Sequence, residues 1–195
     1  SGQKANVVAR SGIARTFQNI ALFSEMTALE NVVTAACTHQ KSNLMDAMLW
    51  SKKLKGEEQE CYDKAYALLD FVGLKGKENL KSRNLPYGQQ RLLEIARALA
   101  TDPKVLLLDE PVAGMNEQES AEAAELVHKL RKSGITILLI EHHMKFVMGL
   151  CDELTVLNGG QKIAEGTPEE IQSNETVIEC YLGKKRGKVV NKANV

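Results

Sequence analysis

Apolar positions along the chain follow two periods, and the change from one to the other divides the sequence. Over residues 23–100 they recur at helical spacing, as in the segment 57–71, where they lie three or four positions apart. Further on, continuous aliphatic runs at 105–108 and 135–140 alternate with helical stretches, which is typical of buried parallel strands joined by helices. The pattern therefore predicts a helical part followed by an α/β part.

Cap residues mark where several of these helices begin. Thr27 with Glu30, and Asn116 with Glu119, have the spacing of a capping box, and Thr167 precedes a proline at the first helical position. These signals predict helices that start near residue 28, at residue 117 with about sixteen residues, and at residue 168. An Asn-Gly-Gly turn at 158–160, between two short strand-like runs, predicts a β-hairpin.

Two acidic residues end the first aliphatic run. Asp109 and Glu110 follow the run 105–108 and precede Pro111. A buried strand would deliver both carboxylates to the carboxyl edge of a parallel sheet, where open α/β sheets bind their ligands. An acid at a strand end can also serve only to cap the following helix, and the run by itself leaves both interpretations open.

The neighbours of this run supply further candidates. Gly88 stands before an apolar stripe at helical spacing, so it is predicted to open a helix whose amino end favours an anion. The run 135–140 leads to His142 and His143, and the helix between the two runs is long enough for the crossover that parallel strands need. Parallel pairing would bring His142 to the same sheet edge as Asp109.

Five motifs in this order resemble the ATP-binding subunits of ABC transporters. They are the glutamine loop at Gln18, the signature at 85–89, the Walker B strand at 105–110, the aspartate loop at 113–116 and the switch histidine His142. The forms of the signature, of the aspartate loop and of Ile140-Glu141-His142 are most similar to subunits that power branched-chain amino-acid uptake in bacteria. The resemblance spans nearly all of residues 8–183 and implies an α/β, P-loop NTPase-like nucleotide-binding domain with an inserted α-helical subdomain.

The resemblance also implies a role for each matching residue in MgATP hydrolysis. Asp109 would hold Mg²⁺ through its water shell, Glu110 would orient and deprotonate the attacking water, and His142 would hydrogen-bond the γ-phosphate. Gln18 would sense Mg²⁺ and the same water while linking the core to the helical subdomain.

The signature would act on ATP that a second subunit holds. In a head-to-tail dimer, Gly88 and the amino end of its helix, with Tyr87 and Gln89, would face the nucleotide of the partner. Asn116 takes the place of the acid in the aspartate loop, where it can still cap its helix. Pro86 stands where the family usually has serine, so one hydroxyl and one backbone N–H are absent from the expected phosphate contacts.

One motif of the family has no match in the chain. No segment fits G-x-x-x-x-G-K-[ST], the loop whose backbone N–H groups and lysine hold the phosphates of ATP. We therefore expect a nucleotide-binding domain that is truncated at its amino terminus and inactive on its own. We also expect the strand at 105–108 to lack a neighbour, because the strand that leads into the phosphate loop would lie beside it.

The motifs give an expected organisation. Residues 1–22 are a remnant of the catalytic core with the glutamine loop, 23–100 the helical subdomain with the signature, 101–183 the α/β core, and 184–195 a basic flexible tail.

With 25 basic and 25 acidic residues, the chain has no excess charge to recruit nucleic acid. Its apolar runs are far shorter than the roughly 20 residues of a membrane-spanning helix. Any membrane contact would therefore need another subunit, and the resemblance implies transmembrane permease subunits at the cytoplasmic face of the inner membrane.

Two other functions compete with the catalytic one. The first is a non-catalytic docking or regulatory fragment that binds the permease through the helical subdomain, which the missing phosphate loop favours. The second is a DNA-repair-type ABC ATPase, a class that usually carries long coiled coils, whereas this chain has no sustained heptad repeat. The leading interpretation implies ATP and Mg²⁺ as cofactors, with permease subunits and a second ATP-binding subunit as partners.

Overall fold

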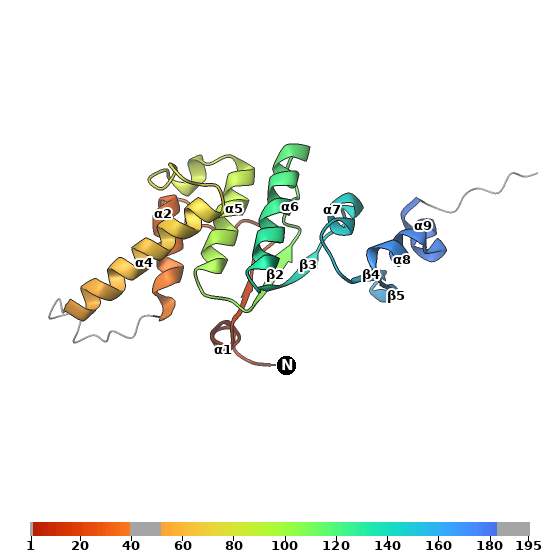
Figure 1. Cartoon of the computed structure of the whole chain (residues 1–195), viewed down its shortest axis with the longest axis horizontal. Coiled ribbons are helices and arrows are strands. Elements are labelled where there is room, and N and C mark those ends of the chain that lie inside the picture. Colours follow the sequence, from red (N-terminus) through yellow and green to blue (C-terminus); the bar gives the residue numbers. More distant parts are fainter. Residues whose placement is uncertain (1, 40–51, 183–195) are drawn as a thin grey trace, which may run out of the picture. The chain divides into compact units, whose positions relative to one another are not determined.

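The structure, a computed structural model, describes residues 2–39 and 52–182 (Figure 1). The predicted basic tail at 184–195 lies outside these residues. The chain divides into two compact units, Ser1–His142 and His143–Val195. The predicted boundaries after residues 22 and 100 both fall inside the first unit, and they stay a prediction.

Helices of the first unit form a packed layer. The helices α2 (Ala28–Ala36), α4 (Lys52–Phe71) and α5 (Tyr87–Leu99) contact one another, and Figure 1 shows them gathered beside the sheet. The short elements η1 (Cys37–His39) and η2 (Ser82–Asn84) contact these helices, and a further short helix, α1 (Ala5–Arg10), precedes the first strand. The apolar stripes predicted from the sequence face inward, so that the largest fully buried side chains of the layer are Val32, Leu69, Leu74 and Leu93.

The predicted caps explain where these helices begin. The hydroxyl of Thr27 accepts a hydrogen bond from the backbone N–H of Glu30 at 3.2 Å, and the Glu30 carboxylate accepts one from the backbone N–H of Thr27 at 2.7 Å. Asn116 and Glu119 make the same reciprocal pair at the start of α6 (Glu117–Lys132). The helix predicted at Gly88 begins one residue earlier, at Tyr87.

The described residues of the first unit also form a parallel sheet of three strands. Its order is β1 (Ile13–Arg15), β2 (Val105–Asp109) and β3 (Thr136–Ile140). The helix α6 makes the crossover from β2 to β3 with its 16 residues, as the sequence predicted. The α/β fold class is thereby confirmed.

The strand expected to lack a neighbour is β2, and this expectation is wrong. Both sides of β2 are paired, with β1 on one side and β3 on the other, and its Leu106 and Leu108 side chains are completely buried. The place beside β2 is taken by β1, whose three residues are too few to give a recognisable strand pattern. Within the part of the chain that the structure describes, β3 is an edge strand, and its Leu138 and Ile140 side chains are 55% and 53% exposed.

The second unit contains the predicted hairpin. Its strands β4 (Leu154–Asn158) and β5 (Gln161–Gly166) pair in antiparallel orientation. The described residues of this unit also form the helices α7 (Met144–Met148), α8 (Pro168–Ser173) and α9 (Glu175–Leu182). A capping box between Thr167 and Glu170 starts α8. Across the described residues of both units, no helix combines the length and the apolar character needed to cross a membrane.

Candidate functional site

The carboxyl ends of β2 and β3 meet at one edge of the sheet. Asp109 stands opposite Ile140 in the parallel register, and the backbone N–H of Glu110 donates to the carbonyl of Ile140 at 2.8 Å. The residues that follow each strand are therefore held side by side. Asp109, Glu110 and His142 lie at this common edge.

The carboxylate of Glu110 is the centre of a small polar group. One oxygen, Oε2, accepts a hydrogen bond from Gln18 Nε2 at 3.0 Å, and the other, Oε1, lies 3.5 Å from His142 Nδ1. The Glu110 side chain is 27% exposed and that of His142 is 60% exposed. We call Gln18, Glu110 and His142 the Glu110 cluster. It joins three predicted site residues that come from three separate segments.

The backbone at Glu110 is strained. Its φ of 47° lies in the left-handed region, which residues with a Cβ seldom adopt and which costs about 1–2 kcal/mol. The conformation is fixed on both sides, because the N–H of Glu110 bonds to Ile140 and its carbonyl accepts from the N–H of Ala113 at 3.2 Å. Strain that is held this firmly is typical of functional sites, and here it turns the chain sharply out of the strand after Asp109.

Asp109 is paired with an arginine that the sequence did not single out. Arg15 Nη2 lies 2.8 Å from Asp109 Oδ2, and the Asp109 side chain is 18% exposed. A carboxylate at a sheet edge is an oxygen ligand of the kind that Mg²⁺ prefers, and Mg²⁺ is usually held by only one or two carboxylates. Asp109 therefore fits a divalent cation, although the guanidinium of Arg15 competes for one of its two oxygens.

Thr16 joins the ends of β1 and β2. Its side chain is buried, its backbone N–H donates to the carbonyl of Leu107 at 3.0 Å, and its hydroxyl accepts from the N–H of Asp109 at 3.4 Å. Thr16 thus fixes the backbone that carries Asp109. Arg15 and Thr16 stand in the glutamine-loop sequence just before Gln18, and this proximity was the signal that could have identified them.

The predicted signature residues form a second group. Tyr87, Gly88 and Gln89 begin α5, and Pro86 provides no side-chain cap there. Gly88 is buried, and a Cβ at this position would lie 2.8 Å from Glu119 Oε1. A Cβ on Gly114 would likewise lie 3.2 Å from the Tyr87 ring. The start of α5 therefore packs against the aspartate loop and the start of α6, where Asn116 caps the helix.

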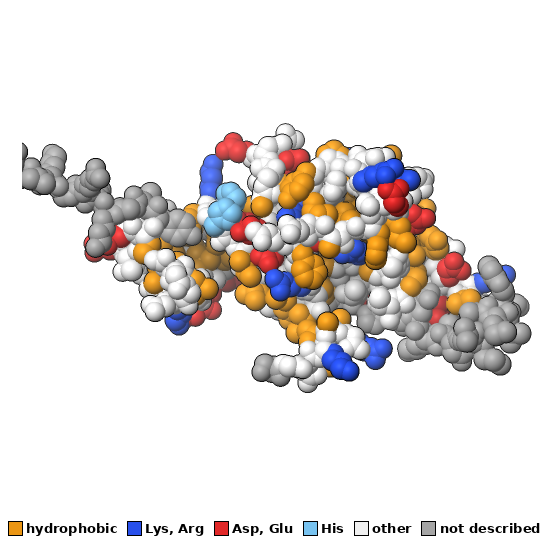
Figure 2. Space-filling view, turned by 180° about the vertical axis from the view of Figure 1, so that it is seen from behind, with side chains coloured by type: hydrophobic (Ala, Val, Ile, Leu, Met, Phe, Trp, Pro, Cys, Tyr) orange, Lys and Arg blue, Asp and Glu red, His pale blue; other side chains and the backbone are white. Residues whose placement is uncertain are grey.

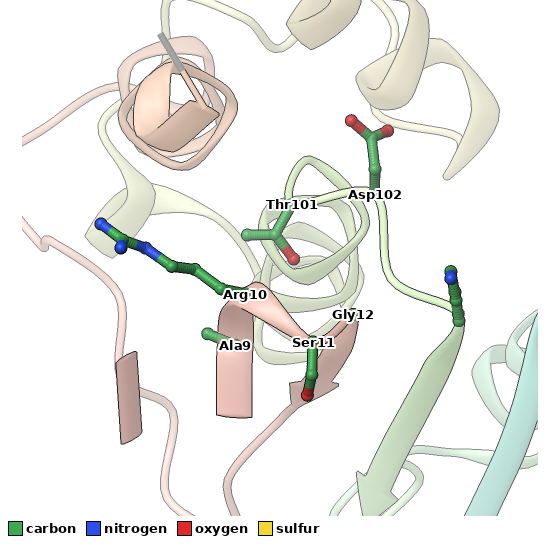
Figure 3. A pocket seen from close by; sticks show the side chains of 7 residues that line it. Ala9, Arg10, Ser11, Gly12, Thr101 and Asp102 are labelled. Atoms are coloured by element: carbon green, nitrogen blue, oxygen red, sulfur yellow. The ribbon is translucent and has the colours of Figure 1, made fainter. Parts of the chain in front are cut away.

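A hollow of about 270 Å³ lies at the other edge of the sheet (Figure 3). It is lined by residues that precede β1 and β2, including Arg10, Gly12, Asp102 and Lys104. Because these residues stand at the amino ends of the strands, the hollow is separated from the Glu110 cluster by the length of the sheet. None of the predicted site residues lines it.

Comparison with known proteins places these motifs in a family. The family model for ABC transporters matches residues 3–113, and the model described as branched-chain amino acid ATP-binding cassette transporter matches residues 161–186. The high-affinity branched-chain amino acid transport ATP-binding protein LivG of Salmonella typhimurium is 45% identical over 93% of this chain and 72% of its own length. BraF of Pseudomonas aeruginosa, described in the same words, is 43% identical over the same shares.

Solved structures agree with these relatives. An ATP-binding cassette of an ABC transporter, MJ1267 in its ADP conformation, has a TM-score of 0.76 at 33% identity and covers 94% of this chain and 73% of that one. A nucleotide-free ATP-binding cassette from an ABC transporter has a TM-score of 0.73 at 34% identity, with 94% and 74% covered. The chain therefore belongs to the nucleotide-binding ABC transporter ATPases, and within them it is similar to the ATP-binding subunits of branched-chain amino-acid transporters.

Proposed function

We propose that this protein is the ATP-hydrolysing subunit of an ABC transporter for branched-chain amino acids. The observation that carries the proposal is the Glu110 cluster, because Glu110 contacts both Gln18 and His142 beside Asp109 at the carboxyl edge of a parallel sheet. The transport of branched-chain amino acids is supported by the relatives LivG and BraF, which carry that description. The same relatives favour a transporter over a DNA-repair ATPase.

In this proposal the chain's own residues divide the work of hydrolysis. Glu110 accepts a proton from the attacking water, a contribution worth about 10²–10⁴ in rate. Gln18 orients its carboxylate by a hydrogen bond, and His142 lies beside Glu110 and is exposed enough to donate to a γ-phosphate. Asp109 and Gln18 would hold Mg²⁺. The positive charge of the ion would neutralise the negative charge that develops on the phosphates during phosphoryl transfer.

The proposed assembly places the protein peripherally at the cytoplasmic face of the inner membrane. A second ATP-binding subunit would receive the start of α5, and transmembrane permease subunits would provide the only membrane contact. Gly88 is buried against the Glu119 carboxylate in the single chain. The Glu119 carboxylate thus lies close to the helix end that faces the partner's nucleotide in the proposed dimer.

The role of Glu110 can be tested in a polypeptide that carries the family's phosphate loop ahead of Gln18. Glu110→Gln should retain ATP binding and lose about 10²–10⁴ in single-turnover rate, because the base is removed while Asp109 stays in place. Glu117→Gln is the matched control, since Glu117 is an exposed acid in the first turn of α6. A Glu110→Gln rate close to that of the control would leave Glu110 with a structural role only.

The 195-residue chain itself is proposed to bind MgATP weakly or not at all. No segment of it supplies the loop N–H groups and the lysine that hold the β- and γ-phosphates. Isothermal titration calorimetry with MgATP measures this directly. Micromolar affinity with one nucleotide per chain would contradict the proposal.

Exposed aromatic side chains favour a second candidate function, docking onto the permease. Phe17 and Phe23 are each 50% exposed and Met26 is 39% exposed, and Figure 2 shows apolar side chains among the charged ones on one face. The backbone of Phe23 is fixed, because Asn31 Oδ1 accepts from its N–H at 2.9 Å and the Ser82 hydroxyl donates to its carbonyl at 2.9 Å. A backbone held in this way loses little freedom on binding.

Docking can be measured without ATP hydrolysis. Phe23→Ser should weaken binding of the chain to detergent-solubilised permease subunits of a branched-chain amino-acid transporter by at least about tenfold, as loss of an aromatic anchor does. Tyr66→Ser is the control, because Tyr66 is also an exposed aromatic, at 48%, but lies on α4. Equal losses for both variants would remove this candidate.

A further inference from the structure

We infer that Arg91 and Glu94 are positioning residues that fix the glutamine loop and thereby place Gln18 against Glu110. Both belong to α5 and are one turn apart, and both side chains are only 3% exposed. The catalytic meaning of this placement rests on the proposed function. The contacts themselves are independent of it.

Arg91 binds the backbone of the glutamine loop at two successive carbonyl groups. Its Nη1 donates to the carbonyl of Phe17 at 2.6 Å, and its Nη2 donates to the carbonyl of Gln18. The planar guanidinium can make both bonds at once because its N–H groups form a fixed fork. The Tyr87 hydroxyl also accepts from Nη2 at 3.0 Å, and the guanidinium lies 5.5 Å from the centre of the Tyr87 ring.

Glu94, on the same helix, accepts hydrogen bonds from Arg91 and from the backbone of the glutamine loop. Its Oε2 accepts from Arg91 Nη1 at 3.2 Å, and its Oε1 accepts from the backbone N–H of Phe17 at 3.4 Å. Two side chains of α5 therefore bind the N–H and the carbonyl of Phe17 together with the carbonyl of Gln18. We call Arg91, Glu94 and these three backbone groups the α5 clamp.

The clamp explains why two charges are buried in the helix. Phe17 and Gln18 lie in an irregular stretch after β1, so their backbone groups belong to neither a strand nor a helix and need other hydrogen-bond partners. Burial of an ion pair is unfavourable unless further hydrogen bonds compensate it, and the backbone of the glutamine loop supplies them here. The pair thus holds the loop in one conformation. In this conformation Nε2 of the exposed Gln18 side chain donates to Glu110 Oε2 at 3.0 Å.

The clamp also connects the two groups of predicted site residues. Gly88 and Arg91 are three residues apart on the same helix, so any displacement of the start of α5 carries Arg91 and the backbone of Gln18 with it. Gln18 in turn contacts Glu110. The clamp therefore connects the signature to the proposed base through one helix.

The test replaces the pair while retaining the volume of the core. The double variant Arg91→Met/Glu94→Leu should stay folded, since buried ion pairs are often replaced by apolar residues without loss of stability. In the unsubstituted chain, Glu110→Gln should shift the side-chain amide resonances of Gln18 in a ¹H–¹⁵N spectrum. In the double variant, Glu110→Gln should no longer shift them, and the backbone amide of Phe17 should exchange about tenfold faster or more.

A matched control removes an exposed ion pair instead. Arg83 and Glu25 form an ion pair with side chains 53% and 64% exposed. In Arg83→Met/Glu25→Leu, the change Glu110→Gln should therefore still shift the side-chain amide resonances of Gln18. Should the clamp double variant fail to fold, Arg91→Lys decides, because lysine keeps the charge beside Glu94 but lacks the fork that reaches both carbonyls. If Glu110→Gln shifts the Gln18 side-chain amide resonances as much in the folded clamp double variant, or in folded Arg91→Lys, as in the unsubstituted chain, the inference is overturned. All spectra are recorded on the nucleotide-free chain, so the result does not depend on whether it hydrolyses ATP.

Discussion

Side chains of the helical layer and of the sheet in the first unit are buried to different degrees. In the layer, the side chains of Val32, Leu69 and Leu93 are completely buried by helices adjacent to one another. In the sheet, Leu106 and Leu108 of β2 are also completely buried, but Leu138 and Ile140 of β3 are more than half exposed. A helix satisfies its backbone within itself, whereas a strand depends on neighbours from distant segments. The helices of the layer therefore satisfy their own backbone, whereas β3 has one side without a strand neighbour among the described residues.

The candidate site lies at the more open of the two regions. Glu110 and His142 follow β2 and β3, with exposures of 27% and 60%, while Gly88 starts a helix that is buried on most sides. Residues that exchange protons with a ligand need access, and residues that position a loop need rigidity. The α5 clamp joins the two requirements, because Arg91 belongs to the layer and the backbone of Gln18 leads to the sheet edge.

The largest difference between the two regions is expected on removal of a leucine side chain. Leu93→Ala should cost about 2–5 kcal/mol of unfolding free energy, because it leaves a cavity in the layer. Leu138→Ala, the matched change in β3, should cost less than about 1 kcal/mol, since more than half of that side chain already faces solvent. Urea unfolding followed by circular dichroism measures both. Equal costs would show that β3 is covered in solution.

Hydrogen exchange should reveal the open edge of the sheet. The N–H of Thr136 bonds to Lys104 across the β2 side, so by alternation the amides of Ile137 and Leu139 point away from β2. They should exchange on the order of 10²-fold faster than the amide of Leu108 in the central strand. Exchange measured by nuclear magnetic resonance in a dilute sample resolves these amides. If protection of Ile137 and Leu139 rises with protein concentration, another chain pairs with β3, and if it matches Leu108 at every concentration, the edge is not open.

The smallest effect is expected at the cap of α2. Thr27→Ala should cost about 1 kcal/mol, because it removes the side-chain partner of the Glu30 N–H. Thr34→Ala in the same helix should change stability by less than about 0.5 kcal/mol, since the Thr34 hydroxyl only bonds to the carbonyl of Glu30 within the helix. Thermal unfolding of the two variants gives the comparison, and equal changes would mean that the capping box does not stabilise the layer.

The same cap gives a pH dependence. The backbone N–H and hydroxyl of Thr27 hold the pKa of Glu30 below its ordinary value. Because the pKa of Glu30 is lower in the folded state, its carboxylate contributes to the stability of the fold above the unfolded pKa. That contribution is lost as the pH falls through the folded pKa. The contribution should therefore be complete at neutral pH and decline below about pH 4. Comparing Glu30→Gln with the unsubstituted chain across this range tests the direction, and a difference that grows in acid would refute it.

The sequence by itself determined the elements with strong local signals. Capping boxes at Thr27 and Asn116 predicted where α2 and α6 begin, and continuous aliphatic runs predicted β2 and β3 with their parallel pairing. It also indicated that Asp109, Glu110 and His142 would share one sheet edge, because parallel strands end on the same side. These features depend on residues close together in the chain, whose propensities and spacing act before any tertiary contact forms.

Only the tertiary structure decided the neighbours of these elements. The three-residue strand β1 has no pattern of its own, yet it occupies the side of β2 that the sequence left open. Arg91 and Glu94 are charged residues of a type that is usually exposed, but here they are buried and bind the backbone of the glutamine loop. The contact between Gln18 and Glu110 spans 92 residues of sequence. Such contacts form only when distant segments pack together, and no local spacing records which segments those are.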